Sequence, residues 1–269
     1  MRLNGTLDSI GSGRRGVSVV VPAFNEGLSI EAVLERVLAT TAELGARYHV
    51  ETIVVDDGSS DETAAVLARL AERRPGAFRI ATHERNRGLE AAIVTGVRSA
   101  RTPVVVLLDA DLSYAPDIVE PLVRKLEESG AGAALASPYM PGGRVANVPR
   151  MRLIASRVAN WLLAFCVGRT LHTFTGMVRA YDREALLPIL AAPAAGEFNT
   201  WIVAQMLSAG RPVVEIPAAL VWPRERYESA SRLTLAALRR RSRQVLTSIV
   251  ALRRGYLTFA KKRAGKLED

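Results

Sequence analysis

The chain contains the stretch Val104-Val-Val-Leu-Leu-Asp109-Ala-Asp111, an apolar run that ends in two carboxylates separated by one residue. Five consecutive β-branched or leucine residues predict a strand buried on both faces, as at the centre of a parallel sheet. Ligands of an open α/β sheet bind beyond the carboxyl ends of its strands, so Asp109 and Asp111 are expected at such a site. Hard oxygen ligands suit Mg²⁺ or Mn²⁺, which are often held by one or two carboxylates plus substrate phosphates. Taken alone, the Asp-x-Asp pattern also fits a polar loop that binds nothing.

The segments before this stretch repeat the same arrangement of strand, polar turn and helix. Strands that alternate with helices at this spacing imply βαβ units, a parallel sheet and right-handed crossovers. Acidic and turn residues at the same end of successive strands are what a nucleotide site requires. Carboxylates there can accept hydrogen bonds from ribose hydroxyls and can hold a cation over a diphosphate. The predicted strands span 17–21, 50–55 and 78–82, and the predicted helices span about 29–44, 62–73 and 90–100.

The length of 269 residues and a hydrophobic content of 49% indicate a globular protein, with nothing that suggests two domains. We expect a flexible glycine-rich segment over 1–16, an α/β domain over 17–232 and a helical tail over 233–269. The single cysteine excludes a disulfide framework and is compatible with a reducing compartment. No segment has the roughly 18 uncharged apolar residues that span a bilayer, and no signal peptide is recognisable, so a cytoplasmic protein is expected.

The net charge of +9 comes entirely from the tail. Residues 221–269 contain 13 Lys+Arg and 4 Asp+Glu, which leaves 23 of each sign in residues 1–220. From Leu235 onward, apolar residues fall on one side of a predicted helix and arginines on the other, as in helices that lie in an anionic membrane interface. Packing of this helix on the domain or on a partner subunit is the alternative. Nucleic-acid binding is disfavoured, because the tail has few aromatic residues among its arginines.

Four motifs follow one another at the separations typical of family 2 inverting glycosyltransferases of the GT-A fold, and the chain resembles that family over about 17–115. They are Val-Pro22-Ala-Phe-Asn-Glu26, Val-Asp56-Asp57-Gly-Ser-Ser-Asp-Glu-Thr63, Arg85-Asn-Arg-Gly88-Leu and Leu-Asp109-Ala-Asp111-Leu. Within the family, the chain is most similar to polyprenyl-phosphate or dolichyl-phosphate mannose and glucose synthases. This resemblance implies a mostly parallel GT-A sheet flanked by helices and followed by C-terminal amphipathic helices. It also implies Mg²⁺- or Mn²⁺-dependent transfer of a hexose from a GDP-mannose or UDP-glucose type of donor to a polyprenyl phosphate.

Carried over position by position, the resemblance and the site chemistry give a set of candidate residues. A phosphate monoester is already mostly dianionic at neutral pH, so this acceptor needs orienting cations rather than a general base. Arginine suits that role because its planar fork binds phosphate in a bidentate way. Arg179 is a further candidate for the acceptor phosphate. The nucleotide-binding candidates are Pro22, Phe24, Glu26, Asp56, Asp57, Arg87, Gly88 and Asp109; the metal candidates are Asp109 and Asp111; the acceptor-phosphate candidates are Arg144, Arg226, Ser231 and Arg232; and the catalytic candidates are Asp109, Asp111, Arg226 and Arg232.

The second half departs from the family pattern at several positions. His172 stands where the family has Asp, and Ser229 stands where its closing motif has Gly. His172 is interpreted either as a structural histidine or as a contact to the acceptor phosphate, and Glu197 as a weaker candidate near the sugar. The apolar stretch Leu153–Val167 predicts a helix that could line a lipid-binding groove. Other functions remain open: transfer to a sugar hydroxyl or another lipid, or a nucleotide-binding or nucleic-acid-binding module.

Overall fold

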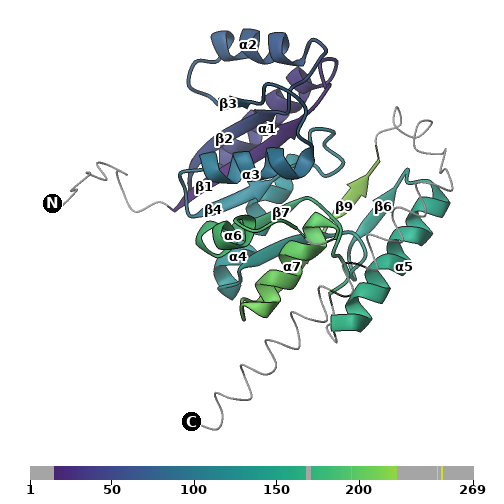
Figure 1. Ribbon diagram of the computed structural model, residues 1–269. Helices are drawn as coiled ribbons and strands as arrows, with labels where there is room; N and C mark the ends of the chain where they lie inside the picture. Colours follow the sequence, from purple (N-terminus) through teal and green to yellow (C-terminus); the bar gives the residue numbers. More distant parts are fainter. Residues whose placement is uncertain (1–14, 168–170, 195, 223–246, 248–249, 251–269) are drawn as a thin grey trace.

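The computed structural model describes residues 15–167, 171–194, 196–222, 247 and 250 (Figure 1). The described strands are β1 (Gly16–Ala23), β2 (His49–Asp56), β3 (Arg79–Thr82), β4 (Val104–Leu107), β5 (Ala133–Ser137), β6 (Arg144–Ala146), β7 (Arg179–Asp182), β8 (Val213–Pro217) and β9 (Ala219–Val221). The described helices are α1 (Ile30–Leu44), α2 (Thr63–Arg73), α3 (Leu89–Ser99), the 3₁₀ turn η1 (Pro116–Ile118), α4 (Val119–Ser129), α5 (Arg150–Val167), α6 (Arg183–Leu190) and α7 (Phe198–Ser208).

The central sheet has seven strands in the order β3-β2-β1-β4-β7-β5-β8. All neighbouring pairs are parallel except those of β7, which runs antiparallel to both β4 and β5. The strand that precedes Asp109 is β4, which lies between β1 and β7 and has every residue buried. The predicted central strand and the predicted mostly parallel α/β fold are therefore confirmed. The antiparallel strand β7 has no counterpart in the predicted run of βαβ units.

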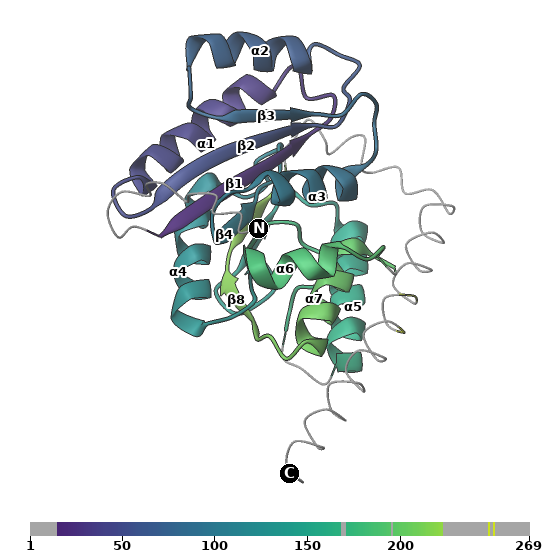
Figure 2. The ribbon, with the colours of Figure 1, turned by 60° about the vertical axis from the view of Figure 1, so that its left-hand side comes forward.

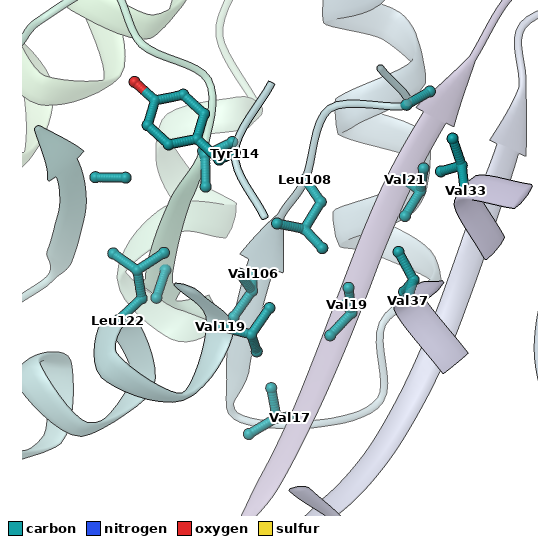
Figure 3. Close-up of a cluster of buried hydrophobic side chains, with 14 of the residues drawn as sticks. Val17, Val19, Val21, Val33, Val37, Val106, Leu108, Tyr114, Val119 and Leu122 are labelled. Carbon is teal, nitrogen blue, oxygen red and sulfur yellow. The ribbon is translucent and has the colours of Figure 1, made fainter. Parts of the chain in front are cut away.

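Helices cover both faces of the sheet, which accounts for the continuous apolar runs of β1 and β4. Alternate residues of these strands enter different cores: Val19 and Val106 face α1, α2 and α4, whereas Val20 and Val105 face α3, α6 and α7. Figure 3 shows the first core, with the valines of β1 between side chains of α1 and of β4. Full burial of each such side chain stabilises the fold by about 1.5–3 kcal/mol.

The first three predicted helices agree with α1, α2 and α3 to within about a residue at each end. A close contact with the sheet explains why α3 contains a glycine. A Cβ on Gly96 of α3 would lie 2.2 Å from a methyl carbon of Val20, so glycine allows α3 to pack directly on β1. This contact holds α3, and the turn that precedes it, against the carboxyl half of the sheet.

The second half adds α5 and a small separate sheet in which β6 pairs in parallel with β9. The predicted helix over Leu153–Val167 is confirmed, since it lies within α5. In the part of the chain that the structure describes, no helix combines the length and apolar character needed to cross a bilayer. The predicted flexible segment 1–16 and the predicted tail 233–269 lie almost entirely outside the described residues.

Candidate active site

The carboxyl ends of the parallel strands β1, β2, β3 and β4 meet at one edge of the sheet (Figure 2). In the strand register Ala23 pairs with Asp56, and Asp56 pairs with Thr82, so these three strands end level with one another. Strand β4 ends three residues earlier in the register, where Leu107 pairs with Val20. The four polar turns that the sequence motifs supply therefore follow from the same edge, as the sequence predicted.

The turns after β1 and β2 are tied together by hydrogen bonds between backbone and side chain. The Asn25 N–H donates to Ser59 Oγ at 3.0 Å, and the Ser60 N–H donates back to Asn25 Oδ1 at 2.9 Å. The Gly27 N–H donates to Asp61 Oδ2 at 3.0 Å. Asn25 has a φ of 55°, a left-handed conformation that asparagine tolerates better than most residues. The two turns thus form one rigid polar frame.

The predicted nucleotide-binding residues of these two turns have different environments. Pro22 is buried at the end of β1, whereas the Phe24 ring beyond it is 42% exposed. Glu26 is partly exposed, and its Oε2 accepts a hydrogen bond from Ser29 Oγ at 2.9 Å. Asp56 is buried, and its Oδ1 accepts from the Ser59 N–H at 3.0 Å and from Ser59 Oγ at 2.6 Å. Phe24 is therefore the residue of this set that presents the most surface to a ligand.

Asp57 connects the turn after β2 to the turn before α3. Its carboxylate accepts from the backbone N–H of Arg87 at 2.9 Å and of Gly88 at 2.7 Å. Its Oδ1 also lies 2.6 Å from Nδ1 of His83, whose Nε2 lies 2.8 Å from Thr95 Oγ1. Asp57 and His83 are both buried. The carboxylate is thus surrounded by groups of the protein itself and fixes the Arg87-Gly88 backbone.

Glycines shape this same turn in two ways. Gly58 has a φ of +66°, and a Cβ there would lie 2.2 Å from the carbonyl carbon of Arg85, so only glycine lets the two turns touch. Gly88 has a φ of +89° and would have no heavy atom within 4 Å of a Cβ. The side chain of Arg87 is exposed. The predicted Arg87-Gly88 pair therefore presents a cation beside an open stretch of backbone, which a phosphate can approach closely.

Asp109 and Asp111 lie on a tight turn that directly follows β4. Both are partly exposed, whereas Ala110 between them is buried. The Ser113 N–H donates to Asp111 Oδ1 at 2.9 Å, and Ser113 Oγ donates to Asp109 Oδ2 at 3.4 Å. Burial and the Asp109 carboxylate raise the pKa of the buried Tyr114 hydroxyl above its usual range. The turn thus leaves both carboxylates partly exposed.

The two carboxylates fit a divalent cation that also binds phosphate. Among the described residues no group of three or more His, Cys, Asp or Glu side chains is arranged to hold a metal. Magnesium retains several waters and is commonly bound through one or two carboxylates plus substrate phosphates, so a pair of aspartates suits it. Asp109 and Asp111 are the residues that would hold the ion, and Mn²⁺ accepts the same oxygen ligands.

The small sheet of β6 and β9 adjoins the turn that carries Asp109 and Asp111. The Val221 N–H of β9 donates to the Ser113 carbonyl at 2.8 Å, and the Arg144 N–H of β6 donates to the Ala218 carbonyl at 2.9 Å. Arg144 itself is exposed. Arg144, a predicted phosphate ligand, therefore lies on a strand that pairs with β9, and β9 is hydrogen-bonded to the turn that carries Asp109 and Asp111. The other predicted ligands, Arg226, Ser231 and Arg232, lie outside the described residues.

The structure corrects the expectation for Arg179. Its side chain is fully buried, and it donates to the carbonyl oxygens of Gly176, Asn199 and Phe174. The guanidinium therefore joins the loop before β7 to the start of α7 and has no surface for an acceptor phosphate. The sequence interpretation failed because arginine buried among carbonyl groups has no local signature that separates it from a surface arginine.

Glu215 and Glu197 both bind the protein's own backbone, and the His172 ring pairs with Glu215. Glu215 of β8 accepts from the backbone N–H groups of His172 and Thr173, each at 2.8 Å, and its Oε2 lies 3.0 Å from Nδ1 of His172. The structural interpretation of His172 is therefore supported. Glu197 is the N-cap of α7 and accepts from the Thr200 N–H at 2.8 Å. Partial burial and, second, the Glu197 carboxylate raise the pKa of Glu90 above its usual value.

Comparison with known proteins agrees with this geometry. The pattern of glycosyl transferase family 2 matches residues 18–189, which is more than half of the chain. A polyprenol monophosphomannose synthase of Mycolicibacterium smegmatis is 33% identical over 206 residues, which cover 74% of this chain and 75% of that protein. An undecaprenyl-phosphate 4-deoxy-4-formamido-L-arabinose transferase of Photorhabdus laumondii is 32% identical over 76% of this chain but only 59% of its own length. The chain belongs to glycosyl transferase family 2 and is a glycosyltransferase.

Solved structures show the same fold. One of them is a mannosyltransferase from Pyrobaculum calidifontis, solved with GDP-mannose and Mn²⁺. The match covers 94% of this chain and 76% of the mannosyltransferase chain, with a TM-score of 0.59 and 21% sequence identity. A mannosyl-3-phosphoglycerate synthase from Rubrobacter xylanophilus matches 88% of this chain and 73% of its own, with a TM-score of 0.59 at 16% identity. At these identities the likeness establishes the GT-A fold and nothing further.

Two residues of the site were missed by sequence reasoning. His83 completes the Asp57 cluster, and Glu215 holds the backbone at His172 and Thr173. His83 does have a local signal, because it directly follows a strand that ends at Thr82 and precedes the Arg-Asn-Arg-Gly turn. Glu215 has no such signal, since its partners lie more than forty residues away in the chain.

Proposed function

We propose that this glycosyltransferase moves a hexose from a GDP-mannose or UDP-glucose type of donor to a polyprenyl phosphate, with inversion, at a membrane surface. The donor half of this proposal rests on the four turns at one edge of the sheet. Asp109 and Asp111 are assigned to a divalent cation, and Phe24, Glu26, Asp56, Arg87 and Gly88 to the nucleotide. Asp57 is assigned a positioning role, because its carboxylate fixes the backbone of Arg87 and Gly88.

The distribution of charge carries the choice of a phosphate acceptor. From Ser129 to Tyr181 the sequence contains no Asp or Glu and six arginines. Beyond Tyr181, Asp182 caps α6 and Glu184 lies in the first turn of that helix, while Glu197 and Glu215 each accept hydrogen bonds from two backbone N–H groups. A hydroxyl acceptor would require a general base, whereas a dianionic phosphate requires only cations that bind and orient it. The acceptor side therefore favours a phosphate over a sugar hydroxyl.

The chain's own residues then perform binding and orientation. A bound Mg²⁺ or Mn²⁺ would act as a Lewis acid that stabilises the departing diphosphate. Arg144, Arg226, Ser231 and Arg232 are proposed to hold the acceptor phosphate for attack, and Arg226 and Arg232 are also proposed to act in catalysis. Holding two anions in reacting geometry accounts for much of the rate enhancement in such transfers. We also propose that the tail over 233–269 adds affinity for an anionic membrane on the cytoplasmic side.

Asp111→Ala tests the proposal most directly. We expect transfer to a short polyprenyl phosphate to fall on the order of 10²–10³-fold, because stabilisation of the leaving group is lost. Transfer would be measured with a panel of radiolabelled donors, including GDP-mannose, UDP-glucose and a nucleotide-linked 4-deoxy-4-formamido-L-arabinose. Asp117→Ala is the matched control, since Asp117 is exposed and outside the turn. Full turnover of the Asp111 variant in excess Mg²⁺ would refute the metal assignment.

A further inference from the structure

The outer face of α5 carries a continuous stripe of exposed apolar side chains. They recur every three or four residues along the helix, which places them on one face. The two aromatic members are the most prominent: Trp161 is 65% and Phe165 is 77% exposed, and their rings stack with centroids 6.0 Å apart. The stripe consists of Met151, Ile154, Val158, Trp161, Leu162 and Phe165.

The opposite face of α5 is fixed to the domain, so the stripe has a defined direction. Leu163 is fully buried in the core shared with α7. Asn160 is also buried, and its Oδ1 accepts from the Phe174 N–H at 2.6 Å. Ser156 Oγ accepts from the Tyr139 hydroxyl at 2.9 Å. Figure 2 shows α5 beside α7 at the end of the molecule away from α2.

Arginines flank the stripe, and the sequence from 129 to 181, which contains α5, has no acidic residue. Arg150 and Arg157 of α5 are exposed. The guanidinium of Arg152 lies 4.3 Å from the ring centroid of Trp222, which directly follows β9. No acidic residue occurs between Ser129 and Tyr181, so the sequence of this helix and its flanking loops carries positive charge only. A protein partner would need a strongly acidic, apolar surface to match it.

We infer that the outer face of α5 docks onto the surface of an anionic lipid bilayer. Large exposed apolar patches on soluble proteins mark interaction sites, and tryptophan prefers the boundary between headgroups and acyl chains. In this arrangement the stripe enters the boundary, and Arg150 and Arg157 contact lipid phosphates. The biological purpose rests on the proposed function, because a polyprenyl phosphate is presented at a bilayer surface. The binding itself does not depend on that function.

The position of α5 gives this contact a consequence for catalysis. The helix follows β6 after a short loop, and β6 pairs with β9, whose Val221 N–H donates to the carbonyl of Ser113 in the turn that carries Asp109 and Asp111, here called the metal turn after its proposed role. Docking through α5 therefore orients the β6 and β9 side of the metal turn relative to the bilayer. Arg144 on β6 would then be presented to a lipid phosphate rather than to solvent.

Vesicle binding of the full chain tests the inference. Pelleting with phosphatidylcholine vesicles that contain phosphatidylglycerol would be compared for the wild type and for Trp161→Ser/Phe165→Ser. We expect the double variant to bind at least about tenfold more weakly, because two inserted aromatic side chains are lost. Trp161→Phe, which keeps an aromatic ring, is the control expected to bind normally. Unchanged binding of the double variant would overturn the inference.

A second measurement shows where the stripe lies in the bound protein. Brominated lipids quench tryptophan fluorescence on contact, and the wild type should be quenched on vesicles while Trp161→Phe loses that quenching. Absence of quenching in vesicle-bound wild type would mean that something else covers the stripe, such as the tail or a second copy, and would overturn the inference. A change of oligomeric mass in the double variant with unchanged vesicle binding would do the same.

The charge of α5 is tested by a matched pair of variants. Arg157→Glu should weaken binding to vesicles containing phosphatidylglycerol, whereas Arg98→Glu, the same change at an exposed site on α3, should weaken it less. Equal effects would show that only total charge matters and would count against docking through α5.

Failure of the proposed function can be told apart from failure of this surface. The double variant should keep transfer to a short, water-soluble prenyl phosphate and lose transfer to a long-chain acceptor in vesicles. A protein that binds vesicles through Trp161 but transfers no sugar to any prenyl phosphate would retain the surface and lose the function. Loss of both activities in the double variant would place the stripe in the catalytic site and overturn the docking role.

Discussion

The proposed donor side and the proposed acceptor side of this enzyme are built in contrasting ways. On the donor side, turns from three strands are joined by polar hydrogen bonds, and buried carboxylates accept backbone N–H groups. On the acceptor side, α5 presents an apolar face bordered by arginines, and the sequence from 129 to 181 contains no acid. The first arrangement suits a soluble, polar ligand that must be held in one geometry. The second suits an amphipathic acceptor whose charged end is held while its chain stays in lipid.

The contrast teaches that rigidity is concentrated where the reaction needs it. The donor frame fixes peptide groups with hydrogen bonds that water cannot easily replace, because Asp56, Asp57 and His83 are buried. The outer face of α5 instead provides apolar surface area and charge, which do not hold a ligand in one geometry. Variants of the donor frame should therefore impair catalysis steeply, and variants of the acceptor surface should act on acceptor binding.

Among the variants that test this contrast between the two sides, Asp57→Asn should have the largest effect. Asparagine keeps one acceptor oxygen but places an NH₂ donor where the carboxylate accepts the backbone N–H groups of Arg87 and Gly88. We expect the free energy of unfolding to fall by about 1–3 kcal/mol. We also expect kcat/KM for the donor to fall on the order of 100-fold, because the Arg87-Gly88 backbone moves. Denaturant titration and initial-rate kinetics measure the two effects.

Asp117→Asn makes the same chemical change at an exposed site and is the control. A positioning role predicts that the donor KM of Asp57→Asn rises more than its acceptor KM. It also predicts that Asp57→Glu recovers little of the lost activity, because the longer side chain cannot fit the buried position. If Asp57→Asn lost stability while its donor kinetics stayed normal, the cluster would be structural only.

The donor half could be predicted from sequence because its signals are local. The strand before Asp109, the turn glycines and the helix starts are all encoded within a few residues of one another, and β1 to β4 follow in order. The fold class and the shared edge of the four turns were therefore correct. Local patterns do not show where each carboxylate lies. Asp57 is buried under the Arg87-Gly88 turn because of its contact with His83, which in turn contacts Thr95.

The acceptor half was harder to predict because its contacts are distant in sequence. Strand β7 joins β4 and β5 in antiparallel fashion, and Glu215 binds the backbone at His172 across more than forty residues. Arg179 looked like a phosphate ligand and is instead fully buried among carbonyl oxygens. The helix α5 was predicted, but its exposed side depends on the buried positions of Asn160 and Leu163.

The double variant Arg226→Ala/Arg232→Ala sharpens the contrast from the acceptor side. Each charge-assisted bond from arginine to phosphate contributes about 1.5–3 kcal/mol, so removal of both should raise the acceptor KM by at least about tenfold. The donor KM should change little, because the donor frame is complete without these residues. Initial rates with varied short-chain acceptor measure this, and Arg98→Ala is a control on α3. A rise confined to the donor KM would reassign both arginines to the nucleotide.

Glu51 is expected to affect stability without affecting catalysis, and it tests whether polar contacts also hold the opposite ends of the donor-side strands. Its Oε1 accepts from Ser18 Oγ of β1 at 2.5 Å and from the Arg101 N–H at 2.7 Å, and its Oε2 accepts from Arg79 of β3 at 2.7 Å. Burial alone would raise the pKa of Glu51, but the hydrogen bonds from Ser18, Arg101 and Arg79 outweigh it and hold the pKa below the usual 4.5.

A lowered pKa in the folded protein means that ionised Glu51 contributes stability above about pH 4.5, and that this contribution disappears as the pH falls through the folded value. Glu51→Gln should therefore lower the free energy of unfolding by about 1–3 kcal/mol at neutral pH, with a difference from wild type that shrinks in acid. Denaturant titrations from neutral pH down to pH 3 measure this, with Glu35→Gln at an exposed ion pair as control. A difference that stays constant across that range would show that Glu51 stabilises the strands by packing and not by its charge. The polar frame of the donor side would then be confined to the edge that binds the nucleotide.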